Sequence, residues 1–274
     1  MNSQNNLSFS VTFEQTVDFI RNRFLLIAIV SIILALFSTI ISNLIFDPSL
    51  ILAQLYYIQS PTQVFTYLIR PLILLYILCI ICISITLAVL YNLSINDKLN
   101  SSLILPRLLP IALNILGYTI IYFIILIALF ILFSLIMFIL SFVLSERVRL
   151  LTTILFLIAV ALIYFSLFYY FLASTIQPST KTFLQRFIDS HKFIFSNWQS
   201  PILIVLISGL INIVLNWFSA LLGNNIIVGV IFSTLSTIIS FFVFSFFYRL
   251  YTVKNNIELP KLDENNQQNQ QIIS

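Results

Sequence analysis

Charged residues are scarce in this chain, and their absence from long stretches defines its class. Only 8% of the residues are Asp, Glu, Lys or Arg, while 60% are hydrophobic. A soluble domain carries about 25% charged residues, so the composition excludes an ordinary soluble fold. Six stretches contain none of the four charged residue types: Phe24–Phe46, Leu72–Tyr91, Leu108–Leu144, Leu150–Leu172, Pro201–Leu222 and Ile226–Tyr248. About 20 apolar residues cross the hydrocarbon core of a bilayer, so the sequence predicts an all-α, polytopic transmembrane bundle of about six spans.

The residues that most enzymes depend on are also rare. The chain has four glycines, one histidine and two cysteines, which leaves little material for a phosphate-binding loop or a metal cluster. Cys79 and Cys82 lie in the middle of a predicted span, where we expect small buried thiols rather than a redox pair, because a reactive thiol needs a polar, accessible site. His191 has no nucleophile or second ligand beside it in the sequence. We therefore predict no enzyme activity, no cofactor and no metal.

Acidic residues are missing from the predicted spans, which argues against proton-coupled transport. The polar groups that do occur there are mild. Asn212 and Asn216 lie four residues apart and share one face of the fifth span, and they are the candidate polar membrane face. Two stripes of hydroxyl side chains mark the first and sixth spans: Ser31, Ser38 and Ser42, then Ser233, Ser236, Thr237 and Ser240. Such residues most often join helices by hydrogen bonds, and a solute path along Asn212 and Asn216 is the alternative.

The distribution of Lys and Arg predicts the orientation. With six spans and a cytoplasmic N-terminus, ten basic residues lie on the inner side and three on the outer side, as the positive-inside rule requires. The run Leu108–Leu144 is long enough for two spans. Splitting it gives seven spans with six basic residues inside and seven outside, which removes the bias. We prefer one long, tilted or broken element here, and a membrane-buried hairpin remains the alternative.

Three regions are predicted along the chain. Residues 1–23 form a cytoplasmic amphipathic segment, residues 24–252 the membrane domain, and residues 253–274 a disordered cytoplasmic tail rich in Asn and Gln. A second amphipathic segment follows Pro178, with Phe183, Phe187 and Phe195 on its apolar side. Both amphipathic segments are expected to lie as helices in the headgroup region.

Several short motifs are spread over nearly the whole chain. They are Phe19-Ile20-Arg21-Asn22-Arg23-Phe24, Phe46-Asp47-Pro48-Ser49, Leu52-Ala53-Gln54-Leu55, Ile104-Leu105-Pro106-Arg107-Leu108 and Tyr248-Arg249-Leu250-Tyr251. In order and placement the chain resembles the YciC family of six-span inner-membrane proteins from Gram-negative bacteria, which has no established activity. The stretch Ser134–Thr153 departs from the family as extra, mostly apolar material. The resemblance implies a bacterial inner-membrane protein with both termini cytoplasmic, and it supplies no catalytic residues.

Two functions remain open. The first is a non-catalytic multi-pass protein that supports envelope organisation or acts within a membrane complex. The alternative is a transporter or channel for a neutral or lipid-like solute. The expected partners are the lipid bilayer and other membrane proteins. Nucleic acid is not expected, because no basic patch is interleaved with aromatic residues.

Overall fold

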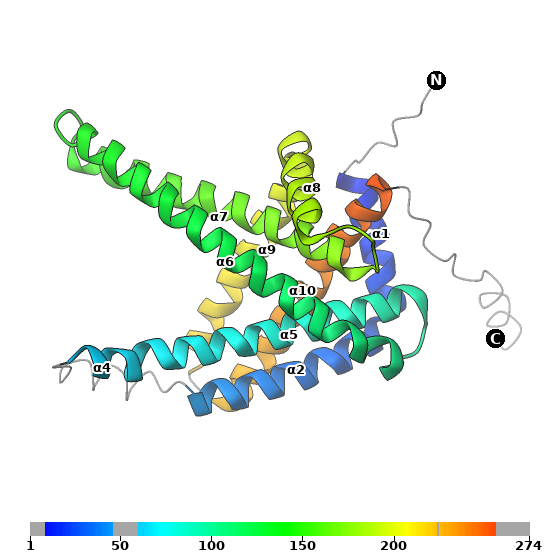
Figure 1. The fold of residues 1–274 in the computed structure, drawn as a ribbon. Helices are drawn as coiled ribbons and strands as arrows, with labels where there is room; N and C mark the ends of the chain where they lie inside the picture. The colour runs from blue at the N-terminus through cyan, green and yellow to red at the C-terminus, as the bar shows by residue number, and fades with distance from the viewer. Residues whose placement is uncertain (1–8, 46–59, 224, 256–274) are drawn as a thin grey trace, which may run out of the picture.

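The structure is a computed structural model that describes residues 9–45, 60–223 and 225–255 (Figure 1). Every regular element in these residues is helical, which confirms the predicted all-α class. The elements are α1 (Phe9–Asn22), α2 (Phe24–Ile45), α4 (Pro61–Val64), the π-helical turn η1 (Phe65–Ile69), α5 (Arg70–Ile95), α6 (Ser101–Leu140), α7 (Glu146–Ile176), α8 (Phe183–Ser196), α9 (Gln199–Leu221) and α10 (Ile226–Lys254).

Six helices of the described residues are long and apolar enough to cross a membrane, as the sequence predicts. They are α2, the continuous helix Pro61–Ile95, α6, α7, α9 and α10. The long run Leu108–Leu144 does not contain two spans. Residues up to Leu140 belong to one continuous helix, and the chain turns within 141–145 before α7 begins. The run lacks charge for so long because the residues of this turn are themselves mostly apolar.

The second candidate span begins earlier than the uncharged stretch Leu72–Tyr91. Pro61–Ile69 is helical and extends α5 toward its N-terminus. Ser60 caps this extension: its hydroxyl accepts a hydrogen bond from the Gln63 amide, and the Gln63 side chain accepts one from the Ser60 amide. Such a capping box starts a helix, and Pro61 at the first position suits it. Residues 46–59 lie outside the described part of the chain.

The well-packed core lies at one end of the bundle. Most buried side chains come from the first half of α2, α6 and α9 and from the second half of α5, α7 and α10. This is the end that also carries α1, α8 and most of the basic residues, and it is called the basic end below (Figure 1). Large aromatic rings fill much of it, including Phe171, Phe246 and Phe247, each 0% exposed.

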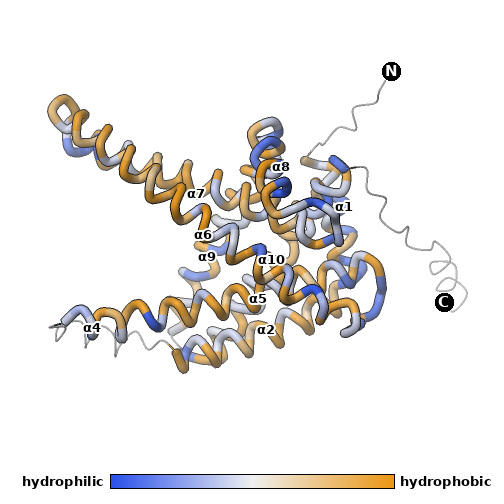
Figure 2. The backbone as a smooth tube through the Cα atoms, viewed as in Figure 1, coloured by the Kyte–Doolittle hydropathy of each residue, from blue (hydrophilic) through white to orange (hydrophobic). Residues whose placement is uncertain are grey.

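Away from the basic end, α6 and α7 leave the bundle as a long hairpin. Figure 1 shows this pair diverging from α2 and α5, and Figure 2 shows it coloured hydrophobic nearly to its tip, where Glu146, Arg147 and Arg149 lie in the sequence. Phe133 stacks on Phe156 across the pair with ring centroids 3.7 Å apart. We call residues 123–158 the arm.

The two predicted amphipathic helices are present as α1 and α8. Helix α1 packs on α10, where Phe9 and Phe13 contact Phe246 and Phe242. Helix α8 begins at a second capping box, formed by Thr182 and Gln185, and it lies across α6 and α7. Gly117 of α6 permits this crossing, because a Cβ there would lie 3.1 Å from Cε2 of Phe183.

Candidate functional site

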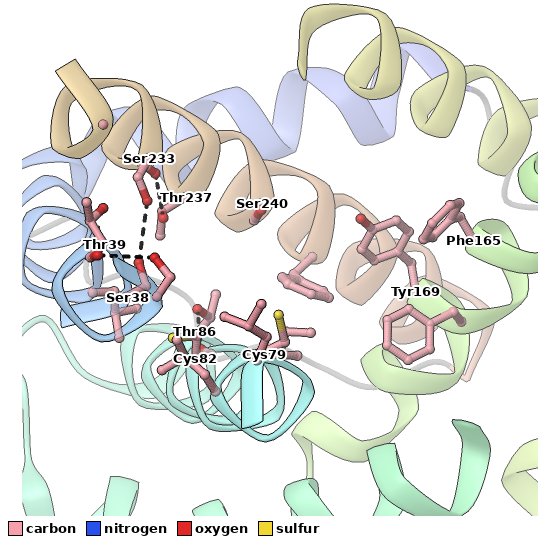
Figure 3. Close-up of a pocket in the computed structure, with 18 of the residues that line it drawn as sticks. Ser38, Thr39, Cys79, Cys82, Thr86, Phe165, Tyr169, Ser233, Thr237 and Ser240 are labelled. Carbon is pink, nitrogen blue, oxygen red and sulfur yellow. Dashed lines mark hydrogen bonds between the residues drawn. The ribbon is translucent and has the colours of Figure 1, made fainter. Parts of the chain in front are cut away.

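A cavity of about 620 Å³ lies between α2, α5, α7 and α10 (Figure 3). It is placed where α7 begins to diverge from α5, so it opens away from the basic end. Its volume falls in the range of small-molecule sites. None of the described residues that line it is Asp, Glu, Lys, Arg or His. The cavity therefore offers no charge to a ligand and no acid or base for catalysis.

Hydroxyl groups from two neighbouring helices line one side of this cavity (Figure 3). Ser38 and Ser42 come from α2, and Ser233, Thr237 and Ser240 come from α10. The hydroxyl oxygens of Ser38 and Ser233 lie 3.5 Å apart, where the two helices meet. The two stripes that the sequence shows are thus brought together. The sequence gives no sign that a cavity lies beside them.

The direction of the hydrogen bonds determines whether these hydroxyls donate to a ligand or accept from it. Ser38 donates to the carbonyl of Ala35 at 3.2 Å, and Thr237 donates to the carbonyl of Ser233 at 2.8 Å. On the facing helix, Thr86 donates to the carbonyl of Cys82 at 2.9 Å. Hydroxyl groups that donate to their own helix keep their lone pairs free. Apart from the side-chain amide of Asn43, a ligand in the cavity therefore meets mainly hydrogen-bond acceptors on an otherwise apolar wall.

Both cysteines of the chain lie on the cavity wall. We expected buried thiols packed against a neighbouring helix; instead Cys79 is exposed, Cys82 is half-buried, and both line the cavity from α5. Packing fails there because α6 and α7 diverge from α5 at this level. No group of three or more His, Cys, Asp or Glu side chains is gathered in the described residues, so these thiols have no partners for a metal site.

Aromatic side chains close the cavity toward the basic end. Tyr169 of α7 lies 5.2 Å from Phe244 and 5.5 Å from Phe247 of α10, measured between ring centroids. Phe244 and Phe247 are buried. The described helices therefore form a pocket with one closed end rather than a continuous channel.

Asn212 and Asn216 lie on α9, outside the cavity. The Asn212 side-chain oxygen accepts a hydrogen bond from Ser236 of α10 at 2.8 Å, and its amide donates to the Ser208 carbonyl at 2.9 Å. Asn212 is half-buried between the two helices, whereas Asn216 is exposed. The geometry of Asn212 is that of a group joining two helices.

His191 is paired with a tyrosine of another helix. The Tyr122 hydroxyl of α6 contacts Nε2 of His191, and the two rings stack with centroids 5.7 Å apart. Nδ1 of His191 lies 2.7 Å from the Phe187 carbonyl. The carbonyl accepts only, so Nδ1 donates to it. His191 thus anchors α8 to α6.

The sequence alone does not predict that these residues line a cavity. It shows the hydroxyl stripes and the two cysteines. It does not show that aromatic side chains close one end of the cavity or that α7 diverges from α5. No protein-family model, curated protein or solved structure matches this chain.

Proposed function

We propose that this multi-pass membrane protein binds a neutral, lipid-like molecule in the cavity between α2, α5, α7 and α10. The observation that carries the proposal is the chemistry of the wall: acceptor oxygens on an apolar surface, with no charged side chain among the described lining residues. A molecule with an apolar body and a few hydroxyl or amide donors matches it. The closed aromatic end supports a carrier or a binding protein over an open channel.

The two native cysteines supply a direct test, because both line the cavity and the chain has no other. The protein in native membranes is treated with an apolar maleimide, with and without added candidate lipids such as diacylglycerol. We expect labelling of both thiols that a bound lipid slows. The Cys79→Ser/Cys82→Ser variant gives the background. Labelling that no neutral lipid affects, together with no co-purified lipid by native mass spectrometry, contradicts the proposal.

A pair of matched variants separates the cavity from the face on α9. Ser38→Leu with Ser233→Leu fills the cavity with apolar volume, whereas Asn212→Leu with Asn216→Leu changes the predicted solute path on α9. The proposal expects bound lipid to be lost in the first variant and kept in the second. The opposite result assigns the solute to the Asn212 and Asn216 face. A thermal unfolding profile like that of the unchanged protein shows that each variant is folded.

A second proposal, membership of a membrane complex, rests on the arm. Its side chains are exposed along α6 and α7, as at Ile124 (63%) and Ile131 (58%). We test it with a photo-crosslinking residue at position 131 and a control at Ile33 of α2, which is 59% exposed. A protein adduct from position 131 alone supports a partner on the arm. Adducts with lipid alone from both positions contradict it.

Placement in the cell is also a proposal. The excess of basic residues at one end of the bundle supports a cytoplasmic basic end with both termini on that side. The resemblance of several short motifs to the YciC family supports a bacterial inner membrane. Non-catalytic function is proposed because the described cavity offers no acid, base or metal ligand set.

A further inference from the structure

Five basic side chains from three helices and one loop lie near one another at the basic end, although like charges repel. Arg107 comes from α6, Lys181 precedes α8, Arg186 and Lys192 belong to α8, and Lys254 ends α10. The charge of Arg107 lowers the pKa of Arg186, and the charge of Arg186 opposes the raised pKa of Lys181. The charges of Lys181 and Lys192 lower the pKa of Lys254. The helices therefore hold these charges together in one patch, here called the basic patch.

Little in the described residues neutralises this patch. Asp189 is the one described carboxylate whose charge acts on it, and Lys181 binds it at 2.7 Å. Lys254 instead lies over the rings of Phe193 and Tyr170, 4.7 Å and 5.7 Å from their centroids. Arg107 lies over the ring of Tyr91 at 4.5 Å. Aromatic faces orient these cations without cancelling their charge.

Arg186 has an unused hydrogen-bond donor within the basic patch. Its Nε is buried with no hydrogen-bond partner among the described residues, and its terminal nitrogen donates only to the Ser179 carbonyl at 3.4 Å. Burial lowers the pKa of Arg186, and Arg107 lowers it further, while Tyr251 opposes them. A guanidinium presents a planar fork of donors that fits phosphate oxygens.

Apolar side chains border the same patch. Leu184 and Ile188 of α8 are 61% and 42% exposed, and with Lys192 they follow at intervals of four residues along one face of the helix. A free anion gains nothing from them, whereas the acyl chains of a phospholipid do. We propose that the basic patch binds the headgroup of an anionic phospholipid, with Arg107 and Arg186 on the phosphate and the exposed apolar edge of α8 against the chains. Basic pockets between transmembrane helices are a known setting for such headgroups.

The test measures lipid binding to the full chain, whose residues beyond 255 include Glu258, Asp263 and Glu264. Protein in phosphatidylcholine nanodiscs is titrated with spin-labelled phosphatidylglycerol. Binding is read from quenching of Trp198, which follows α8 and is 54% exposed. A Trp217→Phe background removes the other tryptophan of the chain. The expected result is saturable quenching by phosphatidylglycerol and none by spin-labelled phosphatidylcholine at the same concentration.

Two variants with the same change of net charge decide whether the patch is responsible. Arg107→Gln with Arg186→Gln is expected to weaken binding about thirtyfold, since each basic residue near an anionic headgroup contributes about fivefold. Arg147→Gln with Arg149→Gln, at the tip of the arm, is expected to leave it unchanged. If the first variant does not fold, Lys192→Gln with Lys254→Gln, both exposed, replaces it.

Three outcomes overturn the proposal. In the first, phosphatidylcholine quenches as strongly as phosphatidylglycerol. In the second, the two double variants weaken binding equally, which shows a response to net charge alone. In the third, inorganic phosphate at millimolar concentration displaces phosphatidylglycerol completely from the patch, which assigns the site to a free anion. If the maleimide experiment shows that no neutral lipid binds in the cavity, these results are unaffected, because the basic patch and the cavity share no residue.

Discussion

The guanidinium of Arg23 donates to the carboxylate of Asp97 at 3.0 Å, and this bond joins the junction of α1 and α2 to the loop between α5 and α6. The Arg23 side chain is only 6% exposed, while Asp97 is 64% exposed. Arg23 also lies over the ring of Phe19, 4.9 Å from its centroid. Burial lowers the pKa of Arg23 and Asp97 opposes that shift. The ion pair therefore offsets part of the cost of burying a cation at the basic end.

We predict that Asp97→Asn lowers the free energy of unfolding by about 1 kcal/mol, at the upper end of the range for pairs with one exposed partner. Asp18→Asn breaks the exposed pair between Arg21 and Asp18 and is expected to cost less than about 0.5 kcal/mol. Denaturation in mixed micelles measures both. Equal effects of the two variants contradict a structural role for Arg23 and Asp97.

Gly117 and Gly209 give a second prediction, since both lie inside helices. Nothing lies within 4 Å of a Cβ added at Gly209, whereas one at Gly117 meets Phe183. Gly209→Ala is expected to stabilise the protein by about 0.5–1 kcal/mol through reduced backbone entropy. Gly117→Ala is expected to lose that gain because Phe183 must shift. Thermal unfolding in detergent compares them, and an equal gain at both sites shows that α8 does not press on Gly117.

A cross-link tests the cavity wall. In a Cys79→Ser/Cys82→Ser background, Ser38→Cys with Ser233→Cys is expected to form a disulfide on mild oxidation, because the two hydroxyl oxygens lie 3.5 Å apart. Ser38→Cys with Thr234→Cys is the control, since position 234 points about 100° away around the helix. Proteolysis between the two positions, followed by non-reducing electrophoresis, detects the bond. Equal cross-linking of both pairs disagrees with the packing of α2 on α10.

Reporter fusions test the topology. A reporter fused after Glu258 is expected to read cytoplasmic, and one inserted at Ser145, in the turn between α6 and α7, to read periplasmic. The reason is that α6 is a single helix, which makes six candidate spans from α2 to α10, and an even number of crossings returns the chain to its starting side. A periplasmic signal at Glu258 contradicts the six-span arrangement.

Much of the fold was predictable because lipid imposes simple requirements on a sequence. Backbone polar groups must be satisfied within each span, so an uncharged apolar run of sufficient length becomes a helix. The predicted span Phe24–Phe46 corresponds to α2 within one residue, and the amphipathic pattern around Phe183 corresponds to α8. Basic residue counts also favoured one long element over two at Leu108–Leu144, and α6 confirms that choice.

The candidate site was less predictable, because it depends on how helices diverge. Ser38 and Ser233 are 195 positions apart in the chain, and their types are equally common in dry helix interfaces. The sequence likewise predicts that Cys79 is buried against a neighbouring helix, because nothing in it shows that the helices diverge there. Apolar pattern specifies which residues enter the membrane, whereas the relative tilt of α5 and α7 decides whether space remains between them.

Helix α6 is 40 residues long and therefore measures about 60 Å, twice the thickness of the hydrocarbon core. Such a helix fits a bilayer by tilting steeply or by locally thickening the lipid around it, each at a modest cost. We therefore expect the hairpin of α6 and α7 to tilt strongly or to deform the bilayer beside it. Thicker membranes reduce that mismatch, so we expect the stability of this protein to depend on bilayer thickness.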